Sequence, residues 1–247
     1  MIEIKSKTHT IRLFANRLQM SDIYKLVLYC GYRGDIAKVP SYYVISKGAS
    51  CCTDLTQSME MIVSLMKSNT RNEIRRAERE GCVFSIVDSM SEFIPYYNGF
   101  CRDKGLNDFT SEARMGKYKN VLMTKVMHRD EVLAMHANIL DYESKVSLLL
   151  YSCSRRLSEN VDRKLIGWGN RFLHYKDLEC LKNLGFEYYD WSGVCMDPND
   201  PRYSIGQFKL SFGGKLIDSW TIKSPLYARL ESLRNSLNLW RHNKGLI

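Results

Sequence analysis

The feature that most constrains this chain is a strand, a long helix and a second strand that follow one another directly. Residues 146–151 form an apolar run that is typical of a central strand covered on both faces. A helix is predicted over residues 162–184, and Gly185 ends it before residues 186–191 return as a strand. Such a connection crosses over in the right-handed sense and leaves its two strands parallel and adjacent. The sequence therefore predicts an α/β sheet with a parallel pair inside it.

The segments around this unit extend the prediction to a mixed sheet flanked by helices. The strand at 145–151 is expected to pair with a strand at 131–141 through a turn at 142–144. Further strands are expected at 82–87 and 215–222, and further helices from a cap at Ser91 to residue 104, over 112–127, near 207–212 and after Pro225.

The first 80 residues differ in character from the rest. Residues 1–52 are rich in strand signals separated by glycine and proline, and a long helix capped by Asp54 or Thr56 is expected to follow, up to Gly81. One face of that helix is apolar, with Ile62, Met66, Ile74 and Ala77. We expect a small N-terminal subdomain over residues 1–80 and the main domain over 81–247.

The opposite face of this helix carries Arg71, Arg75 and Arg79 at four-residue spacing. A solvated basic face is one interpretation, and a grip on an anionic ligand is the other.

Composition excludes several classes of protein and favours one class of partner. With 45% hydrophobic and 26% charged residues, the 247-residue chain is neither disordered nor fibrous. Lysine and arginine number 36 against 27 acidic residues, a net charge of +9 that favours nucleic acid, phosphorylated cofactors or a membrane face. No run reaches the about 18 apolar residues of a membrane span, and residues 1–5 do not read as a signal peptide. We expect a cytoplasmic protein.

The eight cysteines include no C-x-x-C pair, so no metal site is predicted from them.

A ligand site is expected where the two parallel strands end. Open α/β sheets bind ligands beyond the carboxyl ends of their strands, where residues 151–156 and 190–194 fall. The first of these loops leads into a helix N-terminus, and Arg155 and Arg156 are placed to pair with a pyrophosphate there. The chain contains neither G-x-G-x-x-G nor a P-loop, so a dinucleotide or NTPase site is poorly supported.

Three motifs resemble one protein family. They are residues 67–77 with their ending at Gly81, the passage through Leu184-Gly185-Phe186 to Tyr189-Asp190-Trp191-Ser192-Gly193, and Phe208-Lys209-x-x-Phe212-Gly213-Gly214. In this order, over residues 55–220, they resemble the Fem-type aminoacyl and acyl transferases of the GNAT acyltransferase superfamily. The resemblance implies a GNAT-like acyltransferase fold. The chain has room for a single such module.

The family resemblance also implies a function. We expect an N-acyltransferase that moves an acyl group from acyl-CoA, as co-substrate, to the primary amine of a nucleotide-linked amino sugar for surface polysaccharide synthesis. The alternative is an aminoacyl-tRNA-dependent transferase acting on a peptidoglycan precursor. A second alternative is a non-catalytic RNA-binding or scaffold protein that kept the fold.

Four residues are candidates for the chemistry, each with a structural alternative. Asp190 is expected to take the proton of the amine, or to cap a turn. Tyr151 is expected to protonate the leaving thiolate, or to be an aromatic at the sheet rim. Lys209 resembles the family lysine that faces the donor, and is otherwise a solvated helix lysine. His136 is either a base or a core histidine, and its spacing to Cys153 supports no triad.

The remaining predicted contacts surround these four residues. Donor contacts are expected from Ser152, Cys153, Ser154, Arg155, Arg156, Asn160 and Lys164, and acceptor contacts from Arg71, Arg75, Trp191 and Phe208.

Overall fold

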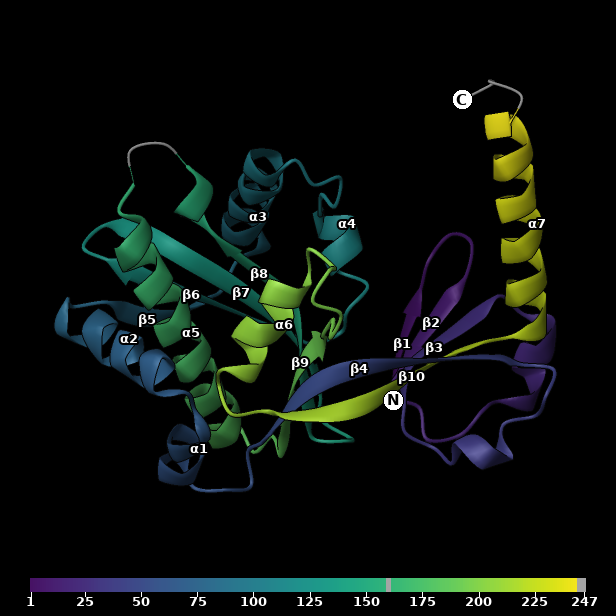
Figure 1. Ribbon diagram of the computed structural model, residues 1–247, viewed down its shortest axis with the longest axis horizontal. Helices are drawn as coiled ribbons and strands as arrows, with labels where there is room; N and C mark the ends of the chain where they lie inside the picture. The colour runs from purple at the N-terminus through teal and green to yellow at the C-terminus, as the bar shows by residue number, and fades with distance from the viewer. Residues whose placement is uncertain (159–160, 244–247) are drawn as a thin grey trace. The chain divides into compact units, whose positions relative to one another are not determined.

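The structure is a computed structural model that describes residues 1–158 and 161–243 (Figure 1). Contacts divide the chain into two compact units, Ser50–Ile217 and a smaller one made of Met1–Ala49 with the segment from Asp218 onward. The division falls elsewhere than the expected boundary at residue 80. Helix α2 (Ser68–Arg79) belongs to the larger unit because it packs along helix α5 (Arg163–Asn183).

The larger unit contains the predicted mixed sheet. Its strands follow the order β4-β9-β8-β7-β6-β5, and every described pair is antiparallel except β8 with β9, which is parallel as predicted. The strands are β4 (Val44–Asp54, which enters this unit at Ser50), β5 (Val83–Val87), β6 (Val121–His128), β7 (Glu131–Asp141), β8 (Val146–Ser154) and β9 (Tyr188–Gly193).

Helices cover both faces of this sheet (Figure 1). One face packs a core with residues of α2 and α5 that includes Leu173, Trp191 and Phe212. The other face packs a core with helices α3 and α4 that includes Phe93 and Met115. The helices of this unit are α1 (Met59–Leu65), α2, α3 (Met90–Lys104), α4 (Glu112–Met115), α5 and α6 (Tyr203–Leu210), with a 3₁₀ turn at Arg155–Leu157.

The prediction of one continuous helix over residues 54–80 is wrong. The chain leaves the helical conformation at Met66 and Lys67, so α1 and α2 are separate helices, and Ser58 rather than Asp54 or Thr56 caps α1. The apolar face was identified correctly, since Ile62, Met66, Ile74 and Ala77 are all buried.

The predicted helix over residues 112–127 is also wrong beyond Met115. Residues from Val121 onward form β6, which pairs with β5 on one side and β7 on the other. A short apolar run fits a helix or a strand equally well, and here pairing with β5 on one side and with the following strand β7 on the other decides it. Helix α3 begins at Met90 and is capped by Ser89, not by Ser91.

A β-bulge in β8 changes which face its side chains occupy. Ala137 pairs with Tyr151 and Asn138 with Leu149, so Leu150 has no partner on β7. Leu149 therefore packs in the α5 core, while Tyr151 packs in the α3 core, two residues later but on the opposite face.

The smaller unit is a strand layer with its own core. Its strands follow the order β1-β2-β3-β10, in which β1 (Ile2–Lys5) and β2 (Thr10–Leu13) are antiparallel and β2 and β3 (Val27–Tyr32) are parallel. Strand β10 (Lys215–Lys223) reaches this unit at Asp218 and leads into α7 (Pro225–Asn243). Short 3₁₀ turns occupy Met20–Tyr24 and Ile36–Lys38. No helix of the described chain combines the length and the apolar character that crossing a bilayer requires.

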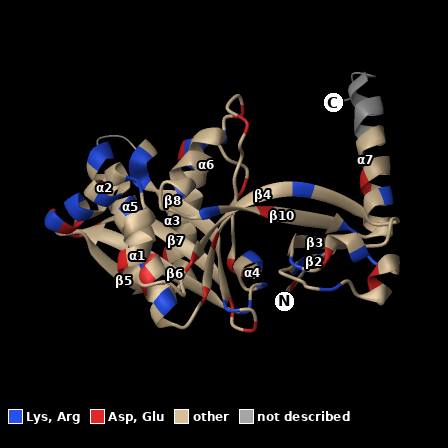
Figure 2. Cartoon of the chain, turned by 60° about the horizontal axis from the view of Figure 1, so that its bottom comes forward, with Lys and Arg blue, Asp and Glu red and all other residues tan. Residues whose placement is uncertain are grey.

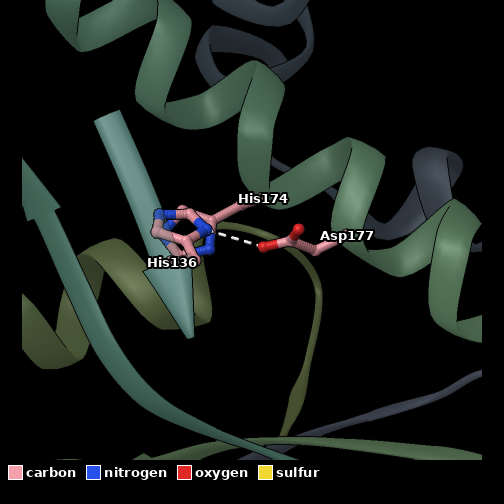
Figure 3. Close-up of side chains that lie close together, drawn as sticks. All are labelled: His136, His174 and Asp177. Atoms are coloured by element: carbon pink, nitrogen blue, oxygen red, sulfur yellow. Dashed lines mark hydrogen bonds and ion pairs between the residues drawn. The ribbon is translucent and has the colours of Figure 1, made fainter. Parts of the chain in front are cut away.

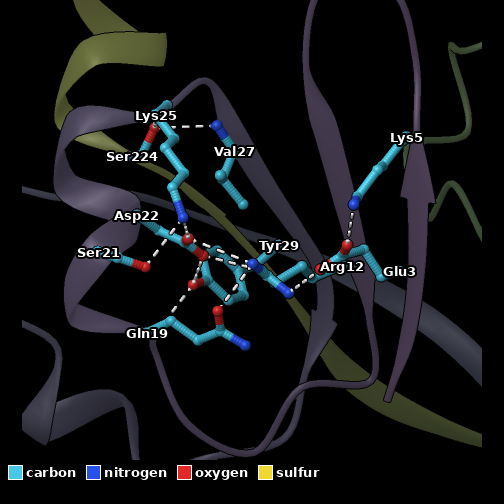
Figure 4. Close-up of polar contacts among 10 residues, drawn as sticks. All are labelled: Glu3, Lys5, Arg12, Gln19, Ser21, Asp22, Lys25, Val27, Tyr29 and Ser224. Carbon is cyan, nitrogen blue, oxygen red and sulfur yellow. Dashed lines mark hydrogen bonds and ion pairs between the residues drawn. The ribbon is translucent and has the colours of Figure 1, made fainter.

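A buried polar network holds the smaller unit together (Figure 4). Arg12 of β2 donates to both carboxylate oxygens of Asp22, at 2.8 and 3.2 Å, and Tyr29 donates its hydroxyl proton to the same carboxylate at 2.5 Å. Glu3 and Gln19 also accept hydrogen bonds from Arg12. Burial by itself raises the pKa of Asp22, but the hydrogen bonds from Arg12 and Tyr29 and the positive charge of Arg12 outweigh it, so the pKa is lowered.

Replacing Asp22 with asparagine leaves the buried Arg12 without its main counter-charge. We expect Asp22→Asn to lower the free energy of unfolding by about 3 kcal/mol, measured by urea denaturation at pH 7. Because the pKa of Asp22 is depressed in the folded state, this contribution is complete above its unfolded pKa of about 3.9. It is lost as the pH falls through the lower folded value.

The matched control is Asp35→Asn, which weakens an exposed pair with Lys38 and keeps a side chain able to cap the same turn. We expect a change below about 1 kcal/mol. Equal losses in both variants would contradict the structural role of the network.

Candidate active site

The site begins where the two parallel strands separate. The ladder between β8 and β9 covers three residue pairs, from Val146 with Tyr188 to Leu148 with Asp190. Beyond them β8 continues along β7 to Ser154, while β9 continues along β4, where Ser50 pairs with Gly193. The sheet therefore opens at the carboxyl ends of its parallel pair, as we expected from the sequence.

A cleft of about 490 Å³ lies at this opening. Its walls come from the end of β8, the first half of α5, α6 and the end of α3. Four of the lining side chains are cationic (Lys104, Arg156, Arg171 and Lys209), three carry hydroxyls (Ser152, Ser154 and Ser204), and the others include Leu149, Ile166, Asn170, His174 and Phe208. The cleft suits a ligand that is anionic in one part and apolar in another.

Two arginines line the part of the cleft that suits the anionic part of a ligand. Arg171 pairs with Glu73 at 2.9 Å and stacks 5.0 Å from the centroid of the Phe208 ring, but its buried Nε–H has no partner among the described residues. Burial lowers the pKa of Arg171, and the positive charge of Arg156 lowers it further against the opposing effect of Glu73. Two neighbouring guanidinium groups are the usual donors to a phosphate or a carboxylate.

Lys209 and Asp190 lie near enough at this end of the sheet for their charges to interact. Burial lowers the pKa of Lys209, and the negative charge of Asp190 opposes that shift. Lys209 donates to the carbonyl oxygen of Gly193 at 2.8 Å. Asp190 is 6% exposed, and its Oδ1 accepts hydrogen bonds from the Ser50 hydroxyl and the Ser192 amide. Since Ser192 has a φ of 66°, Asp190 also stabilises a turn that a non-glycine residue adopts at some cost.

A chain of polar groups is built around the buried His136 and Asp177 (Figure 3). His136 contacts the Asp177 carboxylate through Nδ1 at 2.6 Å and the Asn170 carbonyl oxygen through Nε2 at 3.2 Å. The hydroxyl of Thr124 donates to the other oxygen of Asp177 at 2.7 Å. Both ring nitrogens of His136 are therefore engaged within the protein.

His174 lies against this chain without joining it. Its ring stacks on that of His136, with 4.0 Å between centroids and 32° between planes (Figure 3). Neither of its nitrogens has a hydrogen-bond partner among the described residues, and the side chain lines the cleft.

The donor atoms of His136, His174 and Asp177 lie within 4.8 Å of one another, a separation that admits a metal ion. A metal ion binds in the plane of an imidazole, along the nitrogen lone pair. Because the two rings are nearly stacked, one ion cannot lie in both planes at bonding distance. The absence of a metal stays a prediction.

The structure brings some of the predicted donor contacts together and separates others. Ser152, Cys153, Ser154 and Arg156 line the cleft, whereas Arg155 lines a neighbouring pocket of about 590 Å³ with Asp103 and Asp130. The amide of Lys164 donates to Asp162, which caps α5 and takes the position at the helix N-terminus that we expected a phosphate to occupy. Asn160 lies outside the described residues.

Tyr151 and Cys153, both predicted in the site, pack in the core on the α3 side of the sheet. Tyr151 packs against Tyr97 on the α3 face, with 4.3 Å between ring centroids. The thiol of Cys153 donates to the carbonyl of Met135, and burial raises its pKa, so the thiolate is disfavoured.

The predicted acceptor contacts are likewise divided. Phe208 lines the cleft, whereas Trp191 is buried and donates to Thr53. Arg71 donates to the carbonyls of Ser64 and Met66 at the end of α1. Arg75 lines a groove on α2 instead.

Sequence reasoning missed Asn170, Arg171 and His174. A signal was present, because Asn170, His174 and Asp177 recur at spacings of four and three and so form a polar stripe on one face of α5. Such a stripe on a largely buried helix indicates a buried polar network or a ligand.

No family model matches the sequence, and no curated protein matches it either. Similar solved structures exist. The C-terminal domain of a protein assigned as a lysylphosphatidylglycerol synthetase from Agrobacterium fabrum superposes with a TM-score of 0.60 and 12% identity, over 92% of this chain and 83% of that one.

FemX gives a TM-score of 0.60 and 12% identity over 79% of this chain, which spans 65% of FemX. L-PGS from Bacillus licheniformis gives 0.58 and 13%, over 90% of this chain and 80% of that one. At these identities the likeness concerns the fold. It confirms the GNAT-like, Fem-type fold that the motifs implied.

The pairing of Lys209 with Asp190 is testable by titration. Asp190→Asn removes the charge that favours protonated Lys209, so the pKa of Lys209 should fall further, measured by NMR of ¹³C-methylated lysines. Asp54→Asn, a change elsewhere on the same sheet beside Lys215, should leave Lys209 unchanged. An unaltered Lys209 titration in Asp190→Asn would contradict this pairing.

Proposed function

We propose that this protein is an N-acyltransferase that moves an acyl group from an activated donor to a primary amine. The observation that carries the proposal is the cationic cleft at the point where β8 and β9 separate, with Lys209 and unpartnered polar groups in its walls. The fold likeness to FemX and to lysylphosphatidylglycerol synthetases supports transfer of an acyl or aminoacyl group.

The reaction proceeds by direct attack in a ternary complex. The amine nitrogen forms a bond to the carbonyl carbon, the bond to the leaving group breaks, and the amine proton ends on the leaving group. The raised pKa of Cys153 supports this route over a covalent thioester on that residue. Asp190 as proton acceptor stays a prediction, and the hydrogen bonds that it accepts from Ser50 and Ser192 favour a role in positioning the turn after β9.

The donor we propose is acyl-CoA. Its phosphates would pair with Arg156, which is exposed, and the rest of the molecule would extend into the cleft. Its amide-bearing arm would lie along β8 beyond Leu148, where that strand has no partner on β9. The apolar side chains of the cleft, such as Leu149 and Phe208, suit the remainder of the arm.

The acceptor we propose is an amino sugar carried by a nucleotide. The pocket that shares Phe100 and Ser154 with the cleft supports this choice, because it carries Asp103 and Asp130, which favour an amine, beside Arg155, which favours a phosphate. The amine of such an acceptor would approach the acyl group from the α3 side.

A second candidate function is aminoacyl transfer from tRNA, and one observation favours it. Arg75, Arg76 and Arg79 line a groove of about 750 Å³ on α2, where the Arg76 guanidinium lies 4.9 Å from the centroid of the Trp168 ring. Basic residues recur along α2 (Figure 2). Arginines beside a half-buried aromatic ring suit an RNA backbone with a stacked base. The third possibility, RNA binding without catalysis, predicts no response to coenzyme A.

A thermal-shift panel separates these functions. A ligand at a hundred times its dissociation constant should stabilise the chain by about 2.7 kcal/mol. Stabilisation by coenzyme A and acetyl-CoA supports the first function, and stabilisation by tRNA alone supports the second or third.

The two neighbouring arginines provide a matched test of the donor site. Arg156→Ala should weaken coenzyme A binding about tenfold or more, since it removes a charged donor from the cleft. Arg155→Ala changes the same charge in the neighbouring pocket and should leave the affinity within about twofold. Isothermal titration calorimetry measures both. An equal loss of coenzyme A affinity in both variants would show that the phosphates do not bind in the cleft.

The basic groove has its own test. Arg75→Ala with Arg79→Ala should weaken tRNA binding and reduce the slope of log affinity against log salt by about 1 to 2, if both arginines contact phosphates. Lys119→Ala combined with Lys117→Ala, on the loop after α4, is the control. An unchanged slope of log affinity against log salt would show that Arg75 and Arg79 belong to a solvated helix face and do not contact phosphates.

A further inference from the structure

His174 is the most buried of the described residues that line the cleft, with 1% of its surface exposed. It projects from α5 into a cage of aromatic rings. His136 lies on one side, and Trp191, Phe212 and Phe208 lie 4.9, 5.3 and 5.5 Å away between centroids. The cage fixes the position of the imidazole and offers its nitrogens no partner.

A buried imidazole without partners is uncommon, because its N–H and its lone pair both lose water on folding. Four polar side chains near His174 are already engaged with other groups. His136 and Asp177 bond to each other, Asn170 bonds to His136, and Lys209 donates to Gly193. His174 is also one of the residues that line the cleft, so a ligand bound deep in the cleft is the partner that remains for its ring.

The charges around the ring determine what this partner is. Burial lowers the pKa of His174 well below its usual range, and His136, Lys209 and Arg171 lower it further. The ring is therefore neutral at pH 7, with one N–H to donate. Beside the charged Lys209 and Arg171, a neutral donor suits an oxygen that gains negative charge, and the proton is not withdrawn as the pH changes near neutrality.

The depth at which His174 is buried indicates which oxygen of the ligand it contacts. Arg156 is exposed, whereas His174 is buried against β7 and β9. A donor whose phosphates pair with Arg156 thus extends its acyl end toward His174. Building on the transferase function proposed above, we propose that His174 donates a hydrogen bond to the carbonyl oxygen of the transferred acyl group.

In the step that follows, the amine lone pair forms the new C–N bond and the carbonyl π electrons move to the oxygen that His174 holds. Collapse reforms the carbonyl and breaks the bond to sulfur. The amine proton leaves with the thiol, so atoms and charge balance, and His174 keeps its proton throughout. Its contribution grows as the oxygen becomes negative, which is the condition for accelerating the reaction.

The first test reads His174 directly in the unmodified protein. With ¹⁵N-labelled histidine, acetyl-CoA at saturation should shift the protonated ring nitrogen of His174, whereas coenzyme A, which lacks the acyl carbonyl, should shift it little. Equal shifts with both ligands would overturn the contact to the carbonyl. Absence of binding by either ligand would overturn the proposed donor, and this inference with it.

The second test separates catalysis from binding. His174→Phe keeps an aromatic ring in the cage and removes the donor, and His174→Gln restores an N–H of similar reach. With acetyl-CoA and an amine panel, followed by thiol release, kcat should fall about 10²- to 10³-fold in the phenylalanine variant while KM for acetyl-CoA stays within about twofold. The glutamine variant should recover part of the loss.

His128→Phe, a histidine on β6 outside the cleft, should react at the normal rate. If His174→Phe is not folded by thermal melting, the glutamine variant and the labelled native protein decide the question. A normal kcat in folded His174→Phe would overturn the role of His174 while leaving the proposed acyltransferase function in place.

Discussion

The short parallel ladder between β8 and β9 is the constraint on which the candidate site depends. Three residue pairs join the strands, and each strand then follows a different antiparallel neighbour. Helix α5 connects the two strands and packs on the sheet with Leu173, Leu178 and Leu181 buried. The cleft is therefore an opening within a sheet that is held on both sides, so its walls are strands and helices more than loops.

Polar burial separates the residues that support the cleft from those that face a ligand. One hydrogen-bonded chain runs from Thr124 through Asp177 and His136 to Asn170. A fully bonded chain of this kind is rigid, because rotating any member leaves a buried polar atom without a partner. Among the described residues that line the cleft, the buried polar groups without partners are the Nε–H of Arg171 and the ring of His174. We interpret the bonded chain as the support and the unbonded groups as the contacts.

Among the described residues, the charged side chains that line the cleft are all cationic and favour a negatively charged ligand. Lys104, Arg156, Arg171 and Lys209 line it, while Asp190 lies behind Lys209 and favours its protonated form. Such an arrangement attracts an anionic donor and stabilises negative charge that develops on it. The neighbouring pocket, with Asp103 and Asp130, has the opposite character and suits an amine.

The sequence predicted the parallel pair, the crossover helix and the end of the sheet where the cleft lies, because apolar runs and helix stops are local signals. It also placed Arg156, Phe208 and Lys209 in this region, through the loop position and the family motif. It misplaced Tyr151 because one extra residue in β8 reverses the alternation of side chains, and a bulge depends on pairing with β7. It also missed the break between α1 and α2, where the backbone is extended at Met66 and Lys67.

What the sequence determined by itself was therefore the order of strands and helices that brings two loops to one sheet edge. What only the tertiary structure decided was which polar groups there are satisfied. Arg71 and Arg75 share one helix face, yet Arg71 bonds to the end of α1 and Arg75 lines a groove. His136 and His174 are both buried histidines, yet only His136 finds partners. Hydrogen bonds depend on distances of a few tenths of an ångström between residues far apart in the chain, and no local pattern encodes them.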